Sequence, residues 1–368
     1  MPIRSVAIIG AGTMGSGIAT NITQHGYDTL IIDLSKEAVE NSINSIHRFL
    51  NRSVKKGKLE EIVARNAKQR LTGSIEIAAA ENADLIIEAV FERLDIKSEL
   101  YKKLNPFLKG ETIVSTNTSC LTVSGLAKSV DDAGRFLGLH YFNPASINPI
   151  VEVVRGNDTR QDTINEAVAF CKNTSKKPIL CKDSYGFALN RFFCPYSNEA
   201  VRLFEEGLGT PAQIDQIVQE KMGIAAGPFL VMNLVGMKTM AHAAENLEPH
   251  GNFYKPTATV NEMGVSNKKW NIEEVPDQKT GAEAKILDRM WGAIFLPVLQ
   301  ELDENVSSPS EIDVGAGLAL RFGKAPCVTM DTMGRDEVKR LIDYYCFKYS
   351  IKIPASLDRV GALLANLR

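Results

Sequence analysis

The sequence predicts an α/β domain followed by an all-α region. In the first half, short apolar runs typical of buried parallel strands alternate with helical stretches. In the second half the apolar spacing is helical, and a set of residues recurs after a fixed interval, which indicates an internal repeat. We expect three domains, with the bounds 1–183, 184–280 and 281–368.

The composition argues against several classes of protein. Of the 368 residues, 44% are hydrophobic, which is ordinary for a globular chain. A net charge of −2 argues against nucleic acid as the main partner, and no apolar run reaches the length of a membrane span. The six scattered cysteines lack the Cys/His spacing of a metal site, and the first expected strand begins at residue 3. We therefore expect free thiols, no metal, no targeting segment and a cytoplasmic location.

A glycine-rich turn, residues 10–15 (GAGTMG), follows the first apolar run, 3–9, and opens a helix. The first glycine permits a tight turn, the second lets the backbone approach a pyrophosphate, and the third lets helix and strand pack closely. The phosphates would lie on the amides of the helix N-terminus. The pattern predicts a Rossmann-type dinucleotide-binding domain. The expected cofactor contacts in the turn are Gly10, Gly12, Thr13, Met14 and Gly15.

Asp33 stands at the end of the second expected strand, 28–32, eighteen residues after Gly15. A carboxylate there accepts hydrogen bonds from the ribose hydroxyls of an adenosine and repels the 2′-phosphate of NADP, so the sequence favours NAD. The alternative to a cofactor site is that the glycine-rich turn belongs to some other α/β protein. Asp33 would then be an ordinary turn residue at the end of a strand.

A basic cluster lies on the next expected helix, 36–54, and just beyond it. Arg48, Arg52 and Lys56 recur every four residues and so share one face. They are either a solvated face near a helix C-terminus, where cations are favoured, or a patch that binds a phosphate-rich substrate.

Three charged residues, Glu88, Glu92 and Lys97, lie in or just beyond the apolar run 83–90. Ligands of doubly wound sheets bind outside the carboxyl ends of the strands, so we expect these residues to face the cofactor crevice.

Asn117 and Ser119 follow another expected strand, 112–116. Polar residues at such a place either cap a helix or contact a ligand. From its position alone, Ser119 is interpreted as a cap.

His140 lies at the end of the expected strand 136–141, and Glu152 is the one charge inside the expected strand 150–154. A carboxylate there is costly to bury unless it is paired, and His140 is the obvious partner across the turn. A His–Glu pair orients the imidazole and stabilises its protonated form, as a general base requires. Spacing alone leaves a catalytic pair and a structural pair equally open.

The last strand of this domain is expected at 178–181, and the chain then becomes helical over 187–206. Asn190 falls in the first turn of that helix, where we expect it to face the first domain. The alternative is a cap-like role at the helix N-terminus.

The repeat in the second half has an interval of 98 positions. The matching pairs are Pro211 and Pro309, Ile214 and Ile312, Asp215 and Asp313, Pro228 and Pro326, Met232 and Met330, and Gly236 and Gly334. Both copies predict a capped helix, a loop and a second helix with a proline at its start. Between them, the polar segment 249–280 is interpreted as a long connection.

In this order the motifs resemble the L-3-hydroxyacyl-CoA dehydrogenase family, and the resemblance covers residues 3–248. The matching segments are GAGTMGSGIA at 10–19, IIEAVFE at 86–92, STNTSCL at 115–121, GLHYFNP at 138–144, VEVV at 151–154 and KDSYGFALNR at 182–191. The combination of NTS, GLHYFNP and GF-x-x-NR is highly specific.

The resemblance implies a role for each matching position. His140 corresponds to the catalytic base, Glu152 to the carboxylate that orients it, and Ser119 to the residue that contacts the reacting oxygen. Asn190 corresponds to a contact of the acyl region. The positions implied to contact the cofactor are Asp33, Glu92, Lys97 and Asn117. The resemblance thus favours catalysis for the His–Glu pair and a ligand contact, not a cap, for Ser119.

The repeated helical region resembles the dehydrogenase half of multifunctional fatty-acid oxidation proteins. A second copy could take the place of a partner subunit, so we expect a monomer or a homodimer. The sequence departs from the family at 265–271, where a glycine-rich stretch is missing, and at Cys120, where the family has serine. Both departures bear on acyl-chain specificity.

The implied reaction is NAD-dependent oxidation of a (3S)-3-hydroxyacyl-CoA to a 3-oxoacyl-CoA, with Arg48, Arg52 and Lys56 as candidate contacts of the CoA phosphates. A gulonate-type sugar-acid dehydrogenase shares the same catalytic residues and remains an alternative. A non-catalytic NAD-binding protein, like the lens crystallin relatives, is another. A lysine-dependent β-hydroxyacid dehydrogenase is disfavoured because its glycine-rich helix with a catalytic lysine is not found.

Overall fold

The computed structural model describes residues 3–273 and 281–365. The chain divides into two compact units, Met1–Asp183 and Ser184–Arg368. Within the described residues, no helix is long and apolar enough to cross a membrane.

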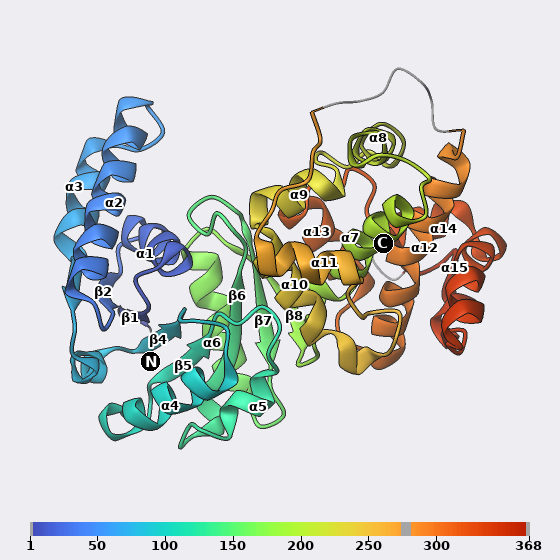
Figure 1. Ribbon diagram of the computed structural model, residues 1–368. Coiled ribbons are helices and arrows are strands. Elements are labelled where there is room, and N and C mark those ends of the chain that lie inside the picture. The colour runs from blue at the N-terminus through green and yellow to red at the C-terminus, as the bar shows by residue number, and fades with distance from the viewer. Residues whose placement is uncertain (1–2, 274–280, 366–368) are drawn as a thin grey trace. The chain divides into compact units, whose positions relative to one another are not determined.

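The first unit is built on one eight-stranded sheet with the strand order β3-β2-β1-β4-β5-β6-β7-β8 (Figure 1). All neighbouring strands are parallel except β6 and β7. The strands are β1 Ser5–Ile9, β2 Asp28–Ile32, β3 Leu71–Ser74, β4 Leu85–Glu88, β5 Ile113–Thr116, β6 Phe136–Tyr141, β7 Ile150–Arg155 and β8 Lys177–Lys182. The chain order reverses between β1 and β4, which is where an open α/β sheet forms its ligand crevice.

Helices cover both faces of this sheet. They are α1 Thr13–Gln24, α2 Lys36–Lys55, α3 Glu61–Arg70, α4 Leu94–Leu104, α5 Val123–Ala127 and α6 Gln161–Asn173. Short 3-10 turns span Ile77–Asn82, Asn105–Phe107 and Ala133–Arg135. The main core joins α1, α2, α3 and α6 to one sheet face, with Ile8, Ile18 and Ile87 fully buried. Side chains alternate along a strand, so the strand residues next to Ile8 and Ile87 in sequence lie on the opposite face of the sheet, which α4 and α5 cover.

The second unit is helical. Its helices are α7 Asn190–Glu205, α8 Pro211–Ile217, α9 Pro228–Val235, α10 Met237–Asn246, α11 Ala258–Ser266, α12 Glu283–Glu304, α13 Pro309–Ala319, α14 Pro326–Met333 and α15 Arg335–Tyr349. A π-helical turn spans Val218–Met222, and 3-10 turns span Glu248–His250 and Ala355–Arg359.

The expectation of a long connection over 249–280 was wrong for its described part, because that part contains α11. Thr257 caps this helix by accepting a hydrogen bond from Val260 N. Asn198 Oδ1 on α7 accepts a hydrogen bond from Thr257 N at 3.0 Å, which ties the segment to its own unit. The expected boundary at 280 lies outside the described residues, so the division of the second unit stays a prediction.

The two segments expected to be repeats share several local contacts. Thr210 and Ser308 cap α8 and α13. The Asp215 carboxylate accepts hydrogen bonds from two amides at the start of α9, and the Asp313 carboxylate does the same at the start of α14. Common origin as a repeat remains a prediction that these contacts support.

Candidate active site

The glycine turn holds β1, β4 and α1 close together. Gly10 has a φ of +114°, and a Cβ there would lie 2.5 Å from the Ala89 carbonyl oxygen. A Cβ on Gly15 would lie 1.9 Å from the Gly10 carbonyl oxygen. Gly12 differs, because a Cβ there would meet nothing within 4 Å. Two of the glycines therefore serve packing, whereas Gly12 faces open space at the N-terminus of α1.

The N-terminus of α1 suits an anion. Gly12 is the N-cap and has no side chain with which to cap the first amides. Thr13 is exposed and Met14 half-buried in this first turn. These features fit the diphosphate of NAD, as the sequence predicts.

Asp33 links the glycine turn to the end of β2. Its carboxylate accepts hydrogen bonds from Ala11 N at 2.8 Å and from Ser35 N at 3.1 Å. The side chain is half-buried, so part of the carboxylate faces solvent beside the glycine turn. Its contact with the adenosine ribose stays a prediction.

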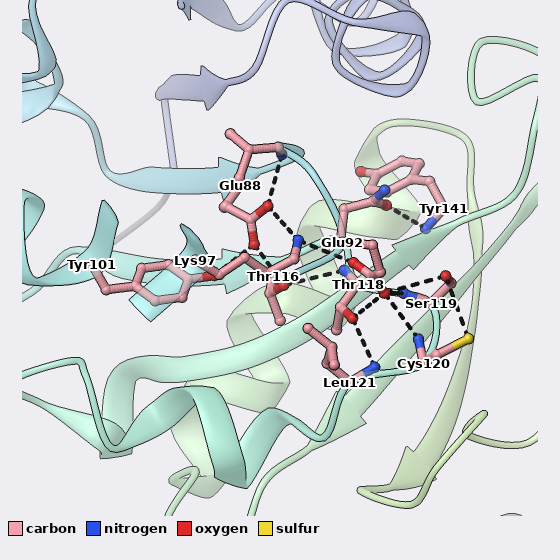
Figure 2. A network of polar contacts seen from close by, with 12 residues as sticks. Glu88, Glu92, Lys97, Tyr101, Thr116, Thr118, Ser119, Cys120, Leu121 and Tyr141 are labelled. Carbon is pink, nitrogen blue, oxygen red and sulfur yellow. Dashed lines mark hydrogen bonds and ion pairs between the residues drawn. The ribbon is translucent and has the colours of Figure 1, made fainter. Parts of the chain in front are cut away.

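A network of polar contacts joins β4, α4 and the segment after β5 (Figure 2). Lys97 is 1% exposed and lies between two carboxylates, 2.5 Å from Glu88 Oε1 and 3.2 Å from Glu92 Oε2. Burial alone would raise the pKa of the Glu92 carboxyl, but the Lys97 ammonium and hydrogen bonds from Thr118 and Ser119 outweigh it. The pKa of Glu92 is therefore lowered, and the carboxylate is ionised at neutral pH.

The segment after β5 is a turn, Asn117–Leu121, which we call the Ser119 turn. Asn117 N donates to the Glu88 carbonyl oxygen at 2.7 Å, and its side-chain oxygen accepts from Tyr141 N at 2.8 Å. Ser119 is not a helix cap, because α5 begins at Val123 with Thr122 as its N-cap. The interpretation of Ser119 from position alone was thus wrong.

His140 and Glu152 are a directly opposed pair on the antiparallel strands β6 and β7. His140 Nδ1 lies 2.6 Å from Glu152 Oε2, and the two residues are 5% and 0% exposed. A carboxylate at this distance favours the tautomer with the proton on Nδ1, which leaves Nε2 as the basic nitrogen. The pairing expected from the spacing is therefore present.

Asn190 lies in the second unit as the first residue of α7, half-buried. It is not the cap of that helix, because Leu189 occupies the N-cap position. In the first unit, Arg48, Arg52 and Lys56 are all exposed at the C-terminal end of α2. The roles of Asn190 and of this basic face in binding substrate stay predictions.

Two residues that bond to Glu88, Tyr101 and Thr116, were not expected from the sequence. Tyr101 Oη and Thr116 Oγ1 both donate to Glu88 Oε2 at 2.8 Å. The available signal was the spacing of Lys97 and Tyr101, four residues apart on α4 and hence on one helix face.

A Rossmann-type sheet with an open glycine turn and a buried His–Glu pair near its strand ends defines a nicotinamide-dependent dehydrogenase. Residues 5–184 match the family model of the 3-hydroxyacyl-CoA dehydrogenase NAD binding domain, and residues 186–271 match that of the C-terminal domain. The chain therefore belongs to the 3-hydroxyacyl-CoA dehydrogenase family and is an NAD-dependent oxidoreductase.

Known relatives are similar over most of the chain. Mouse mitochondrial hydroxyacyl-coenzyme A dehydrogenase is 33% identical over 276 residues, which cover 73% of this chain and 88% of that protein. The 3-hydroxyadipyl-CoA dehydrogenase of Escherichia coli is 36% identical over 234 residues, which cover 64% of this chain and only 49% of that protein.

Solved structures extend the similarity to the fold. The (S)-3-hydroxybutyryl-CoA dehydrogenase of Ralstonia eutropha is 33% identical with a TM-score of 0.70, over 73% of this chain and 96% of that one. The 3-hydroxybutyryl-CoA dehydrogenase of Escherichia coli covers 100% of both chains with a TM-score of 0.88 at 23% identity, a likeness that bears on fold alone.

Proposed function

We propose that this chain catalyses the reversible oxidation of a (3S)-3-hydroxyacyl-CoA to the 3-oxoacyl-CoA, with His140 as the general base. The observation that carries the proposal is the buried contact of 2.6 Å between His140 Nδ1 and Glu152 Oε2. The family and the names of the relatives supply the substrate class.

The cofactor fits the described residues. Gly12 leaves an open approach to the amides of α1, and Asp33 stands beside it at the end of β2. Bound NAD⁺ supplies the acceptor for the hydride that leaves C3 of the substrate.

The proton from the C3 hydroxyl goes to Nε2 of His140. Glu152 holds the ring through Nδ1 and offsets the positive charge that forms on the imidazole. The products are the 3-oxoacyl-CoA, the reduced cofactor and a proton released later from His140. We assign Ser119 to the C3 oxygen, Asn190 to the thioester region, and the exposed basic face of α2 to the CoA phosphates.

The test is oxidation of NADH with acetoacetyl-CoA, followed by absorbance. Replacement of His140 by alanine should lower kcat by roughly 10²-fold or more, because general acid–base catalysis contributes about that much. The matched control is His242→Ala on α10, a half-exposed histidine outside the site. Wild-type kcat in the His140 variant would remove His140 from the mechanism.

L-Gulonate with NAD⁺ serves as a second substrate in the same assay. Turnover of gulonate without turnover of acetoacetyl-CoA would transfer the chain to the sugar-acid dehydrogenases. NADH binding with no turnover of either substrate would favour a non-catalytic protein or an unusual acyl group, and a panel of longer and branched thioesters separates these two outcomes.

The proposal extends to location and assembly. We propose a reducing compartment, the cytoplasm, because all six cysteines are buried and none forms a disulfide. The mouse relative is named mitochondrial, so fractionation of cells that express the chain is the deciding measurement.

We also propose a monomer or a homodimer. Light scattering that gives a mass above that of two chains would contradict this.

A further inference from the structure

Glu88 is a fully buried carboxylate of the network in Figure 2, and no step of the proposed mechanism uses it. It is the last residue of β4 and is 0% exposed. Oε1 accepts from Val90 N at 2.8 Å and from Lys97 Nζ at 2.5 Å. Oε2 accepts from Tyr101 Oη and Thr116 Oγ1, both at 2.8 Å. Four donors thus converge on one buried carboxylate.

A first route leads from Glu88 to the Ser119 turn through Lys97. The ammonium contacts Glu88 with one side and Glu92 Oε2 with the other, at 3.2 Å. This contact fixes the Glu92 carboxylate and turns Oε1 toward the Ser119 turn. There, Oε1 accepts from Ser119 N at 2.8 Å and from Cys120 N at 3.1 Å.

A second route avoids the lysine. Thr116 Oγ1 donates to Glu88 Oε2 and accepts from Thr118 N at 3.1 Å. The Thr118 hydroxyl in turn donates to Glu92 Oε1 at 2.5 Å. The Glu88 side chain is thus linked to Thr118, Ser119 and Cys120 of the Ser119 turn through intermediate residues, and its own hydrogen bonds go to other residues.

We propose that Glu88 is a positioning residue for the reaction, which acts through Lys97, Glu92 and Thr116 to fix the turn that carries Ser119. This inference rests on the proposed function, in which Ser119 contacts the reacting oxygen. It also gives Glu92 a second task beside its predicted contact with the cofactor, because its Oε1 is bonded to the backbone of the Ser119 turn.

The chemistry explains why a carboxylate stands at this position. Lys97 is buried between two acids, and a lone ammonium there would be costly. With Glu88 neutral, Lys97 would be drawn toward Glu92, and Glu92 could no longer divide its two oxygens between the lysine and the turn. A displacement of about 1 Å at a catalytic group can cost on the order of 10²-fold in rate.

The test compares Glu88→Gln, which keeps the shape and removes the charge, with Tyr101→Phe. Tyr101 bonds to the same carboxylate but lies on neither route, so this control reports the general cost of losing one buried hydrogen bond. Two quantities are measured: kcat for acetoacetyl-CoA at saturating NADH, and amide hydrogen exchange over residues 118–121 without substrate. In Glu88→Gln, kcat should fall at least tenfold and exchange should become at least tenfold faster, while Tyr101→Phe stays within about threefold of wild type on both.

The proposal is overturned if either quantity remains at its wild-type value in Glu88→Gln, or if Tyr101→Phe changes both as strongly. Should Glu88→Gln fail to fold, Thr116→Val decides by the same two readouts, because it cuts the second route and keeps the carboxylate. Absence of wild-type turnover would defeat the proposed function instead, and the exchange measurement, which needs no substrate, would then decide the positioning role alone.

Discussion

Replacement of Gly12 by alanine separates cofactor binding from folding. Gly12 has φ −71° and ψ −170°, which any residue adopts, and its Cβ would meet nothing within 4 Å. Alanine is a poorer N-cap than glycine, but Gly→Ala at a compatible conformation stabilises by about 0.4–1 kcal/mol. These effects offset each other, so the free energy of unfolding should change by less than about 1 kcal/mol and Tm by less than about 4 °C.

Binding of NADH should respond far more strongly. The added methyl group would occupy the space through which the diphosphate approaches the amides of α1. Loss of one hydrogen bond to a charged group costs about 1.5–3 kcal/mol, which corresponds to roughly a 10- to 150-fold rise in Kd. Fluorescence titration with NADH and a thermal melt of the same sample measure both quantities.

Gly15→Ala is the matched comparison, because its Cβ would lie 1.9 Å from the Gly10 carbonyl oxygen and would force the backbone apart. Overpacking of this kind costs about 1–3 kcal/mol or more, so this variant should lose stability as well as affinity. The reasoning is refuted if Gly12→Ala binds NADH within threefold of wild type, since the diphosphate then cannot lie over Gly12. A loss of Tm as large as that of Gly15→Ala would equally refute it.

Two further predictions concern stability. Burial lowers the pKa of Lys176 from 10.5 to about 8. Between pH 8 and pH 10.5, the unfolded chain therefore binds more protons than the folded chain. The free energy of unfolding of the wild type should rise by up to about 3 kcal/mol as the pH increases over this range. Urea titrations of Lys176→Met, in which this rise should be missing, provide the check, and an identical pH dependence in both proteins would contradict it. Asp215→Ala and Asp313→Ala should each destabilise the chain by about 0.5–2 kcal/mol, because each leaves two amides of a helix N-terminus without an acceptor. Denaturant midpoints test this, and a large effect at one site with none at the other would argue against equivalent units.

Buried parallel strands were predictable because a strand covered on both faces must be a continuous apolar run. β2 and β6 have the expected bounds, and β4 differs from the expected run only at its ends. β3 was missed because the edge sequence LTGS has only one buried residue and no apolar run. In such a strand the pairing partner, and not the local sequence, decides the structure.

Helix α11, in the second unit, is another element that the local sequence alone does not predict. The helix contains Gly264, which weakens a helix in isolation. The glycine is there because a Cβ would lie 2.5 Å from the Cβ of Ala241 on α10. Only the packing of the two helices makes this sequence a good helix, and spacing along the chain does not reveal that packing.

The His–Glu pair was predictable for a reason that lies in the core. On β6 and β7 the residues that flank the pair, Tyr141 and Val151 among them, are buried in the main core on the opposite face of the sheet. A slip of one residue between these strands would move that apolar set out of the main core to the other face of the sheet, so the core fixes the register and the register places His140 opposite Glu152. Glu88 follows a different logic, because its partners come from α4 and from the end of β5. The His–Glu pair is therefore encoded in the alternation of two neighbouring strands, whereas the network around Glu88 depends on how a helix packs on the sheet, which the sequence pattern leaves open.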